Sequence, residues 1–172
     1  PDASGLIVYY DNVSGVRSQG AEAAFKYRLP FGGLTFASSA AYTATVTTAP
    51  YVAPDGTNLP PGQAWPLAPR WQTATTLSHL NGWGDWTFGA SVTHTYLGEA
   101  INNLARRQEI FGYSLVDAQI NLANTAWQWM PDVALVMGNI ADTRGRTNAD
   151  GDPTDYIYLP PRSLILRLSG NF

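Results

Sequence analysis

The segment 148–152, Asn-Ala-Asp-Gly-Asp, is the stretch whose spacing most suggests a metal site. Oxygen-bearing side chains alternate along it, and oxygen ligands at alternate positions can wrap a hard cation such as Ca²⁺. The pattern then fails, because Pro153 stands where a calcium loop needs glycine and Leu159 where it needs a bidentate glutamate. We interpret the segment as a solvated turn in a polar loop, and we expect no metal site there.

The chain has two histidines, His79 and His94, and neither belongs to a catalytic motif. The strand pattern places them near opposite rims of the predicted sheet, so they cannot share a site. His94 follows the apolar face of its strand beside Tyr96, which favours an interfacial position over catalysis. The sequence also lacks a Gly-x-Ser-x-Gly elbow, a P-loop and a His-Glu-x-x-His helix. We therefore expect no enzyme and no cofactor.

The adjacent arginines Arg106 and Arg107 lie in a polar segment between two predicted strands. Guanidinium groups bind anions in a fixed fork geometry, so the pair is a candidate for binding an anionic ligand. The alternative that we favour is a solvated pair or one that faces lipopolysaccharide.

Several charged and amide side chains share one parity along the predicted strands. Successive side chains of a strand point to opposite faces, and arginine or lysine on the lipid face of a barrel costs about 2–4 kcal/mol at the midplane. These side chains are predicted to face the lumen, where they either hydrate the wall or contact another part of the protein. They are Glu22, Lys26, Arg28, Asp117, Gln119, Arg167 and Asn171.

The chain contains few charged residues, yet it is not hydrophobic on average. Charged residues make up 13% of the chain, against roughly 25% in soluble domains, while the mean hydropathy is -0.14. No run approaches the roughly 18 apolar residues of a membrane helix. Membrane strands that alternate lipid-facing and lumen-facing residues fit this balance, and an aromatic content of 12% fits their interfacial girdles. A net charge of -3 with a single lysine argues against a nucleic-acid partner.

Turn-forming clusters divide the chain into seven segments that alternate with period two, which predicts an all-β, antiparallel up-and-down meander. Tight turns are expected at 30–33, at 81–84, where Asn-Gly is a hairpin signal, and at 128–131. The predicted strands are 6–29, 34–48, 68–80, 85–98, 112–125, 132–142 and 161–172.

Long polar loops alternate with these tight turns, at 49–67, 99–111 and 143–155. Short periplasmic turns and long extracellular loops are the pattern of outer-membrane barrels. With the C-terminus in the periplasm, the three loops are predicted to lie outside the cell.

The last predicted strand has an apolar face that runs to a terminal aromatic residue. Ile165, Arg167, Ser169 and Asn171 occupy its other, mostly polar face. A closing strand that ends in phenylalanine is similar to the terminal strand of outer-membrane barrels, where it belongs to the signal read by the barrel-assembly machinery. The predicted signal residues are Leu164, Leu166, Leu168, Gly170 and Phe172.

Seven strands cannot close into the usual even-numbered barrel of eight or more. An open sheet would leave unpaired edges, which hydrocarbon does not tolerate. We therefore expect residues 1–172 to be the C-terminal segment of a large transmembrane β-barrel. Two alternatives are a complete barrel of about eight strands, with a turn at 11–15 and a structural or adhesive role, and a soluble β-sandwich that binds a partner.

An ordered set of short motifs resembles the C-terminal part of the TonB-dependent outer-membrane receptors. The set comprises residues 17–22, the Pro-Arg-Trp at 69–71, the segment 113–117, the Asn-Ile-Ala-Asp at 139–142, and the closing segment 158–172. Two positions depart from the family's pattern: Ala21 stands where a larger aliphatic residue is usual, and Ala141 replaces the customary aromatic residue before the aspartate.

The resemblance implies a 22-stranded barrel whose lumen is closed by an N-terminal plug. The implied function is import of a scarce nutrient, such as a ferric siderophore, through the outer membrane of a Gram-negative bacterium. The implied partners are outer-membrane lipid and lipopolysaccharide, the barrel-assembly machinery, a small-molecule ligand, and the TonB complex through an N-terminal part that this chain lacks. The lumen-facing residues would contact the plug or line the path of the ligand.

Overall fold

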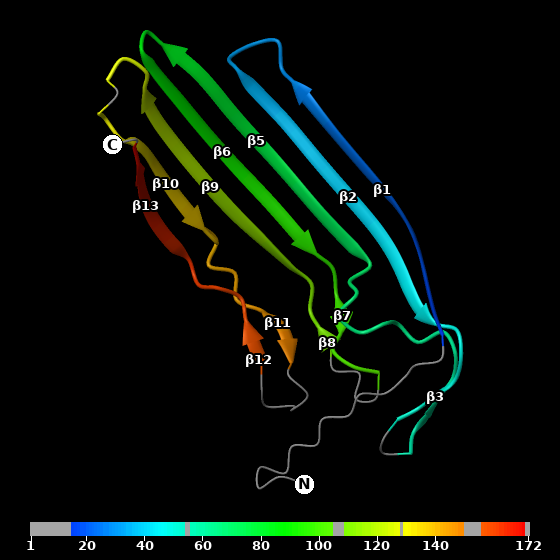
Figure 1. Ribbon diagram of the computed structural model, residues 1–172. Helices are drawn as coiled ribbons and strands as arrows, with labels where there is room; N and C mark the ends of the chain where they lie inside the picture. Colours follow the sequence, from blue (N-terminus) through cyan, green and yellow to red (C-terminus); the bar gives the residue numbers. More distant parts are fainter. Residues whose placement is uncertain (1–14, 54–55, 105–108, 128, 150–155, 171–172) are drawn as a thin grey trace, which may run out of the picture.

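A computed structural model describes residues 15–53, 56–104, 109–127, 129–149 and 156–170 of the chain. These residues form one long, curved antiparallel sheet (Figure 1). Its strand order follows the sequence, so every neighbour in the sheet is also the next long strand along the chain, as the predicted meander requires. The seven strands are β1 (Val16–Arg28), β2 (Leu34–Thr47), β5 (Trp71–Trp83), β6 (Trp86–Leu97), β9 (Tyr113–Asn124), β10 (Asp132–Gly138) and β13 (Ser163–Ser169).

The three predicted loops contain short hairpins of their own. These pairs are β3 (Tyr51–Val52) with β4 (Asn58–Leu59), β7 (Ala100–Ile101) with β8 (Glu109–Ile110), and β11 (Arg146–Ala149) with β12 (Tyr156–Tyr158). All three lie at one end of the sheet, here called the loop end, and the tight turns lie at the opposite turn end (Figure 1). The predicted alternation of short and long connections is therefore confirmed.

The hairpin between β5 and β6 turns later than predicted. Asn81 and Gly82 were expected in the turn, but both lie within β5 and pair with β6. Trp83 pairs directly with Trp86, which leaves a two-residue connection whose first residue, Gly84, has φ +57°. Glycine at the first central position is what a type II′ hairpin turn requires, so Gly84 determines the turn in preference to the Asn-Gly pair.

Strand β10 also ends earlier than predicted, at Gly138 instead of Asp142. Asn139 has φ +47° and Asp142 has φ +50°, a backbone conformation that breaks a strand. The predicted first strand, 6–29, is observed from Val16, and its residues 6–14 lie outside the described part of the chain.

The buried side chains of the described residues are few, and most lie towards the loop end. Examples are Thr47 at 2% exposure, Ala53 at 3% and Leu159 at 7%. The described strands form an open sheet with β1 and β13 as its edges. The described residues form neither of the two alternative folds. Their sheet does not close into a small barrel, and no second large sheet covers it to make a sandwich.

No helix among the described residues is long and apolar enough to cross a membrane.

Candidate functional site

The sheet has an apolar face and a polar face, and the strand register defines both. Directly paired residues project to the same side of a sheet. Large apolar side chains on the apolar face are exposed, for example Tyr27 at 59% and Leu164 at 67%. One row of this face crosses all seven strands: Tyr27, Phe36, Leu77, Val92, Ala118, Met137 and Leu164. An apolar surface of this extent indicates a lipid or protein partner.

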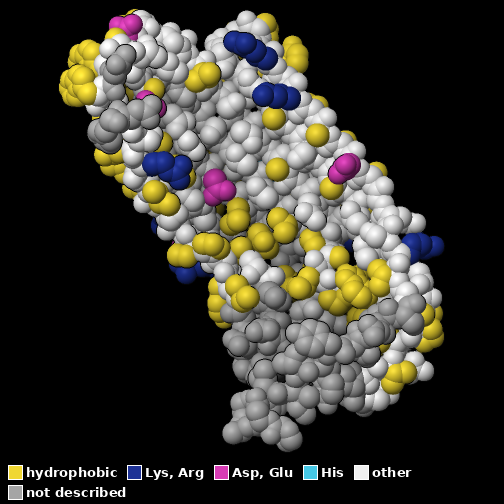
Figure 2. All heavy atoms as spheres, viewed as in Figure 1, with side chains coloured by type: hydrophobic (Ala, Val, Ile, Leu, Met, Phe, Trp, Pro, Cys, Tyr) yellow, Lys and Arg dark blue, Asp and Glu magenta, His cyan; other side chains and the backbone are white. Residues whose placement is uncertain are grey.

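The six described residues that were predicted to face the lumen all lie on the opposite, polar face. Glu22 pairs with Ala41, which pairs with Gln72, and Arg167 pairs with Ala134 in the same parity. Figure 2 looks onto this face, where charged side chains stand over the sheet and hydrophobic side chains gather mainly towards the loop end. Their common face follows from the register, and their contact with a plug remains a prediction.

Two of these six side chains are engaged within the sheet. An Asp117 carboxylate oxygen accepts a hydrogen bond from the backbone N–H of Asn139 at 2.8 Å. The Gln119 amide donates to Asn121 Oδ1 at 2.6 Å. Asp117 and Gln119 therefore have structural partners, while Glu22, Lys26, Arg28 and Arg167 have no ion pair within the described residues.

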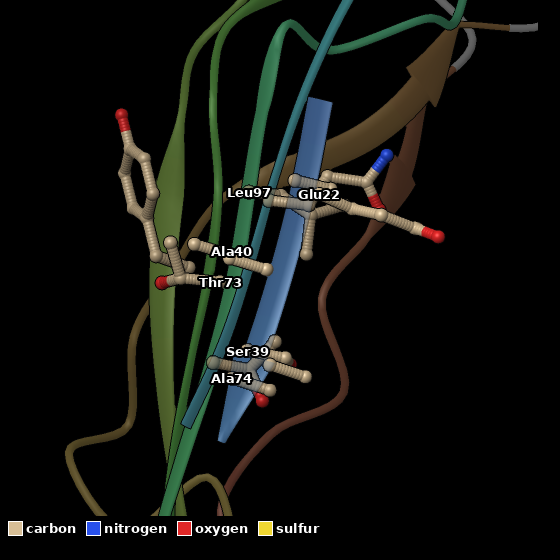
Figure 3. A pocket seen from close by; sticks show the side chains of 12 residues that line it. Glu22, Ser39, Ala40, Thr73, Ala74 and Leu97 are labelled. Atoms are coloured by element: carbon tan, nitrogen blue, oxygen red, sulfur yellow. The ribbon is translucent and has the colours of Figure 1, made fainter. Parts of the chain in front are cut away.

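A hollow of about 590 Å³ lies on the polar face over β1, β2, β5 and β6. In Figure 3, Glu22 and Leu97 project to one side of the sheet and Thr73 to the other. Small side chains leave the backbone of β2 and β5 open to close approach at the hollow's floor. The side chains of the polar face that line it are Glu22, Ala24, Ser39, Ala41, Gln72, Ala74, Thr95 and Leu97.

This polar-face hollow offers one carboxylate, one amide and two hydroxyls to whatever occupies it. It therefore suits a hydrogen-bonding ligand or a polypeptide segment better than an apolar one. Of the six described residues that were predicted to face the lumen, only Glu22 lines it. The sequence signal for this hollow is the series of alanine and serine side chains that β2 places on its polar face. It was missed because small residues form a depression only when the neighbouring strands are in register.

A second hollow, of about 230 Å³, lies at the loop end and contains charges of both signs. Arg70, Glu99 and Glu109 line it together with Trp65. None of these four residues was a predicted site residue. Glu99 precedes β7 and Glu109 is the first residue of β8. The sequence gives no indication that this hairpin brings them near Arg70.

Asn139 joins three parts of the chain that are distant in sequence. Its side chain is almost fully buried, with the residue 4% exposed. Its Nδ2 donates to the carbonyl oxygens of Thr143 at 3.0 Å and Pro160 at 2.8 Å, and its Oδ1 accepts from the N–H of Thr143 at 2.8 Å. With the bond from its own N–H to Asp117, it ties β9, the end of β10 and the start of the closing strand together. We call this arrangement the Asn139 junction.

Asp142 extends the junction towards the loop end. Its carboxylate pairs with the Arg144 guanidinium at 2.8 Å and accepts from the N–H of Arg162 at 3.2 Å. The hydrogen bond from the Arg144 side chain, and then the one from the Arg162 backbone, lower the pKa of Asp142 from its usual value of 3.8. Asn139 and Asp142 are the two ends of the Asn-Ile-Ala-Asp motif, so the motif has a structural role.

A pH dependence follows from the lowered pKa of Asp142. The ionised carboxylate is favoured in the folded chain, so its stabilising effect is present above the ordinary aspartate pKa and is lost as the pH falls through the lowered one. We expect hydrogen-exchange protection of the Arg162 amide to be constant from neutral pH to about pH 5 and to fall below about pH 4. The amide of Ile140, which bonds the Val116 carbonyl, is the control. Equal pH profiles for both amides would contradict the expectation.

The remaining predicted site residues are placed as follows. Arg106, Arg107, Asn171, Phe172 and residues 150–152 lie outside the described part of the chain. Among the residues that the structure does describe, no group of three or more potential metal-ligating side chains gathers. His79 pairs with Ala90 and His94 with Thr75, four residues apart along β5, so they are separated as predicted.

The closing strand has the predicted alternation. Leu164, Leu166 and Leu168 pair with Met137, Leu135 and Val133 of β10 on the apolar face and are 60–67% exposed. Gly170 follows the end of β13. Recognition of these residues by the assembly machinery stays a prediction.

Comparisons with known proteins agree with this architecture. Residues 1–159 match the family model described as TonB dependent receptor-like, beta-barrel. A similar solved structure is that of the siderophore receptor PiuA from Acinetobacter baumannii, with a TM-score of 0.64 and 16% sequence identity. The match covers 88% of this chain but 21% of that one, so the chain spans about a fifth of the length of that receptor. No curated protein matches the sequence significantly.

Proposed function

Because the chain belongs to the TonB-dependent receptor β-barrel family, we propose that it forms the C-terminal strands of an outer-membrane receptor that imports a scarce nutrient, such as a ferric siderophore. Members of this family are transporters of the Gram-negative outer membrane. The structurally similar PiuA is a siderophore receptor, which supports an iron chelate as the first ligand class to test.

The observation that carries the proposal is an open sheet with an exposed apolar face and two free edges. A soluble protein rarely exposes such a face, and a lipid-embedded sheet must have its edges paired. In the parent receptor, β1 and β13 pair with further strands, the apolar face contacts lipid, and the polar face lines the lumen. The loop end lies outside the cell and the turn end in the periplasm.

The proposal assigns roles to the other parts of the parent protein. An N-terminal plug fills the lumen against the polar face, and Glu22, Lys26, Arg28 and Arg167 contact it or hydrate the path. The TonB complex acts on that N-terminal part. The barrel-assembly machinery reads the closing strand. The loop-end hollow, with Arg70 and two glutamates, would contact ligand or lipopolysaccharide. Arg106 and Arg107, which lie outside the described residues, stay candidates for the same contact.

Filling the polar-face hollow should impair import. We expect Ala41→Trp in the full-length receptor to reduce uptake of radiolabelled ferric siderophore at least tenfold, because the indole occupies space that the plug or ligand needs. Ala40→Trp, one residue away on the apolar face, is the matched control and should import normally.

Uptake should also vanish when the TonB complex is inactivated. Normal uptake by the Ala41→Trp receptor would show that the polar-face hollow is not part of the transport path. If a panel of iron chelates gives no uptake that depends on the receptor and on TonB, iron import is wrong, and cobalamin and saccharides become the ligands to test.

A further inference from the structure

Four tryptophans gather at the turn end of the sheet. The Trp127 and Trp129 rings stack with centroids 5.8 Å apart and planes 6° apart, and Trp86 meets Trp127 edge-on at 6.5 Å. Trp83 pairs with Trp86 across the β5–β6 hairpin and is 86% exposed. Indoles combine an apolar ring with an N–H donor and favour the membrane–water interface. This tryptophan cluster marks where the apolar face meets that interface.

A cleft of about 360 Å³ opens on the apolar face beside the cluster. We call it the rim cleft. Its size lies within the roughly 300–1,000 Å³ of small-molecule sites. Its lining is mainly aromatic and apolar, and His79 and Asn81 are its two polar side chains. The full lining is His79, Asn81, Gly82, Trp83, Trp86, Phe88 and Leu122.

His79 and Asn81 are the unusual members of the rim cleft. Both project to the apolar face, since His79 pairs with Ala90 and Asn81 with Phe88. His79 contacts the Phe88 ring at 6.1 Å, and within the described residues neither side chain has a hydrogen-bond partner. A polar group that faces lipid without a partner is costly, so the bilayer itself must supply hydrogen-bonding groups at this depth.

An apolar hollow of about 340 Å³ continues the rim cleft towards the middle of the sheet. The two share His79, and the second is lined by apolar side chains that include Leu77, Val92 and Ile120. From the turn end inwards, the order is therefore tryptophan, then Asn81 and His79, then aliphatic side chains. This order matches a glycerophospholipid, whose headgroup, ester groups and acyl chain follow one another in the same direction.

We propose that the rim cleft binds one glycerophospholipid of the periplasmic leaflet. The indoles of Trp83 and Trp86 border its headgroup, Asn81 and His79 hydrogen-bond its phosphate oxygens, and one acyl chain lies in the apolar hollow. The proposal goes beyond nutrient import and rests on the outer-membrane placement proposed above. The cleft is continuous with the lipid-facing surface, which is why a phospholipid is its occupant and not a soluble anion.

Native mass spectrometry of the full-length receptor with added phosphatidylethanolamine tests this assignment. We expect one phosphatidylethanolamine to survive delipidation in the wild type, and the retained fraction to fall at least fivefold in the double variant His79→Leu/Asn81→Leu. Leucine suits the lipid face, so the variant should still fold, which the heat-modifiable migration of the barrel checks. His94→Leu, on the same face but outside the cleft, should retain lipid as the wild type does.

Diacylglycerol with the same chains separates headgroup recognition from general lipid contact. It should not be retained. Equal retention of diacylglycerol, or full retention of phosphatidylethanolamine by the double variant, would overturn the proposal. Siderophore uptake by the wild-type receptor keeps the two proposals apart. A wild type that imports siderophore but retains no phosphatidylethanolamine opposes only the lipid site, and a wild type that retains phosphatidylethanolamine but imports no siderophore opposes only nutrient import.

Discussion

Arginine at position 92 should strongly destabilise the parent barrel. Val92 lies in the middle of β6 on the apolar face, paired with Leu77 and Ala118, and is 49% exposed. If that face contacts lipid, a guanidinium near the midplane costs about 2–4 kcal/mol. We expect Val92→Arg to lower the unfolding free energy of the full-length receptor by that amount in urea titrations, and to reduce the folded, heat-modifiable fraction in outer membranes.

Ser91→Arg is the matched control, one residue away on the polar face. Ser91 pairs with Ser78 and Gln119, so its side chain points to the side that we assign to the lumen. There the charge can hydrate, and we expect a change below about 1 kcal/mol, as for most surface substitutions. The comparison holds strand, depth and introduced residue constant and changes only the face. Equal destabilisation by the two arginines would refute the assignment of the faces.

The faces could be predicted from sequence because strand parity is a local property. Glu22 and Phe25 point to opposite sides whatever their neighbours do, once β1 is extended. The number of strands and the alternation of connections follow from turn signals of the same local kind. The family resemblance, confirmed by the match over residues 1–159, depends on the order of such local motifs.

Features that depend on pairing between strands could not be predicted in the same way. Asn81-Gly82 and Gly84-Asp85 are competing turn signals, and the pairing of Trp83 with Trp86 decides between them. The polar-face hollow exists because small residues of β2 and β5 lie side by side in this register. The hairpin β7–β8 and the charges that it brings towards Arg70 depend on contacts within a loop that composition alone describes as irregular.

The Asn139 junction is the clearest example of such a long-range feature, and it carries the second large prediction. Asn139 was recognised only as part of a motif, because its partners Thr143, Pro160 and Asp117 stand 4, 21 and 22 residues away. Removing the amide leaves the Pro160 and Thr143 carbonyls and the Thr143 N–H without their partners at a buried position. A buried polar group without a partner costs about 1–3 kcal/mol, so we expect Asn139→Ala to destabilise the full-length receptor by about 3 kcal/mol in urea titrations.

Two further substitutions separate the side chain of Asn139 from its backbone. Glycine tolerates φ +47° but makes none of the side-chain hydrogen bonds, whereas alanine loses the bonds and also strains the left-handed backbone by roughly 1 kcal/mol. Asn139→Gly should therefore lie between the wild type and Asn139→Ala. Asn139→Asp keeps the acceptor for the Thr143 N–H but sets a carboxylate against two carbonyl oxygens, so it should be no better than alanine.

The relative stabilities of these variants show whether the side chain or the backbone of Asn139 holds the start of the closing strand. Hydrogen exchange adds a local readout, since the Thr143 amide bonds Asn139 Oδ1 and should lose protection in the glycine and alanine variants and keep more of it in the aspartate variant. A glycine variant as stable as the wild type would show that only the backbone turn matters. A glycine variant clearly less stable than the wild type would instead mean that the segment between β10 and β13 is anchored through the Asn139 amide.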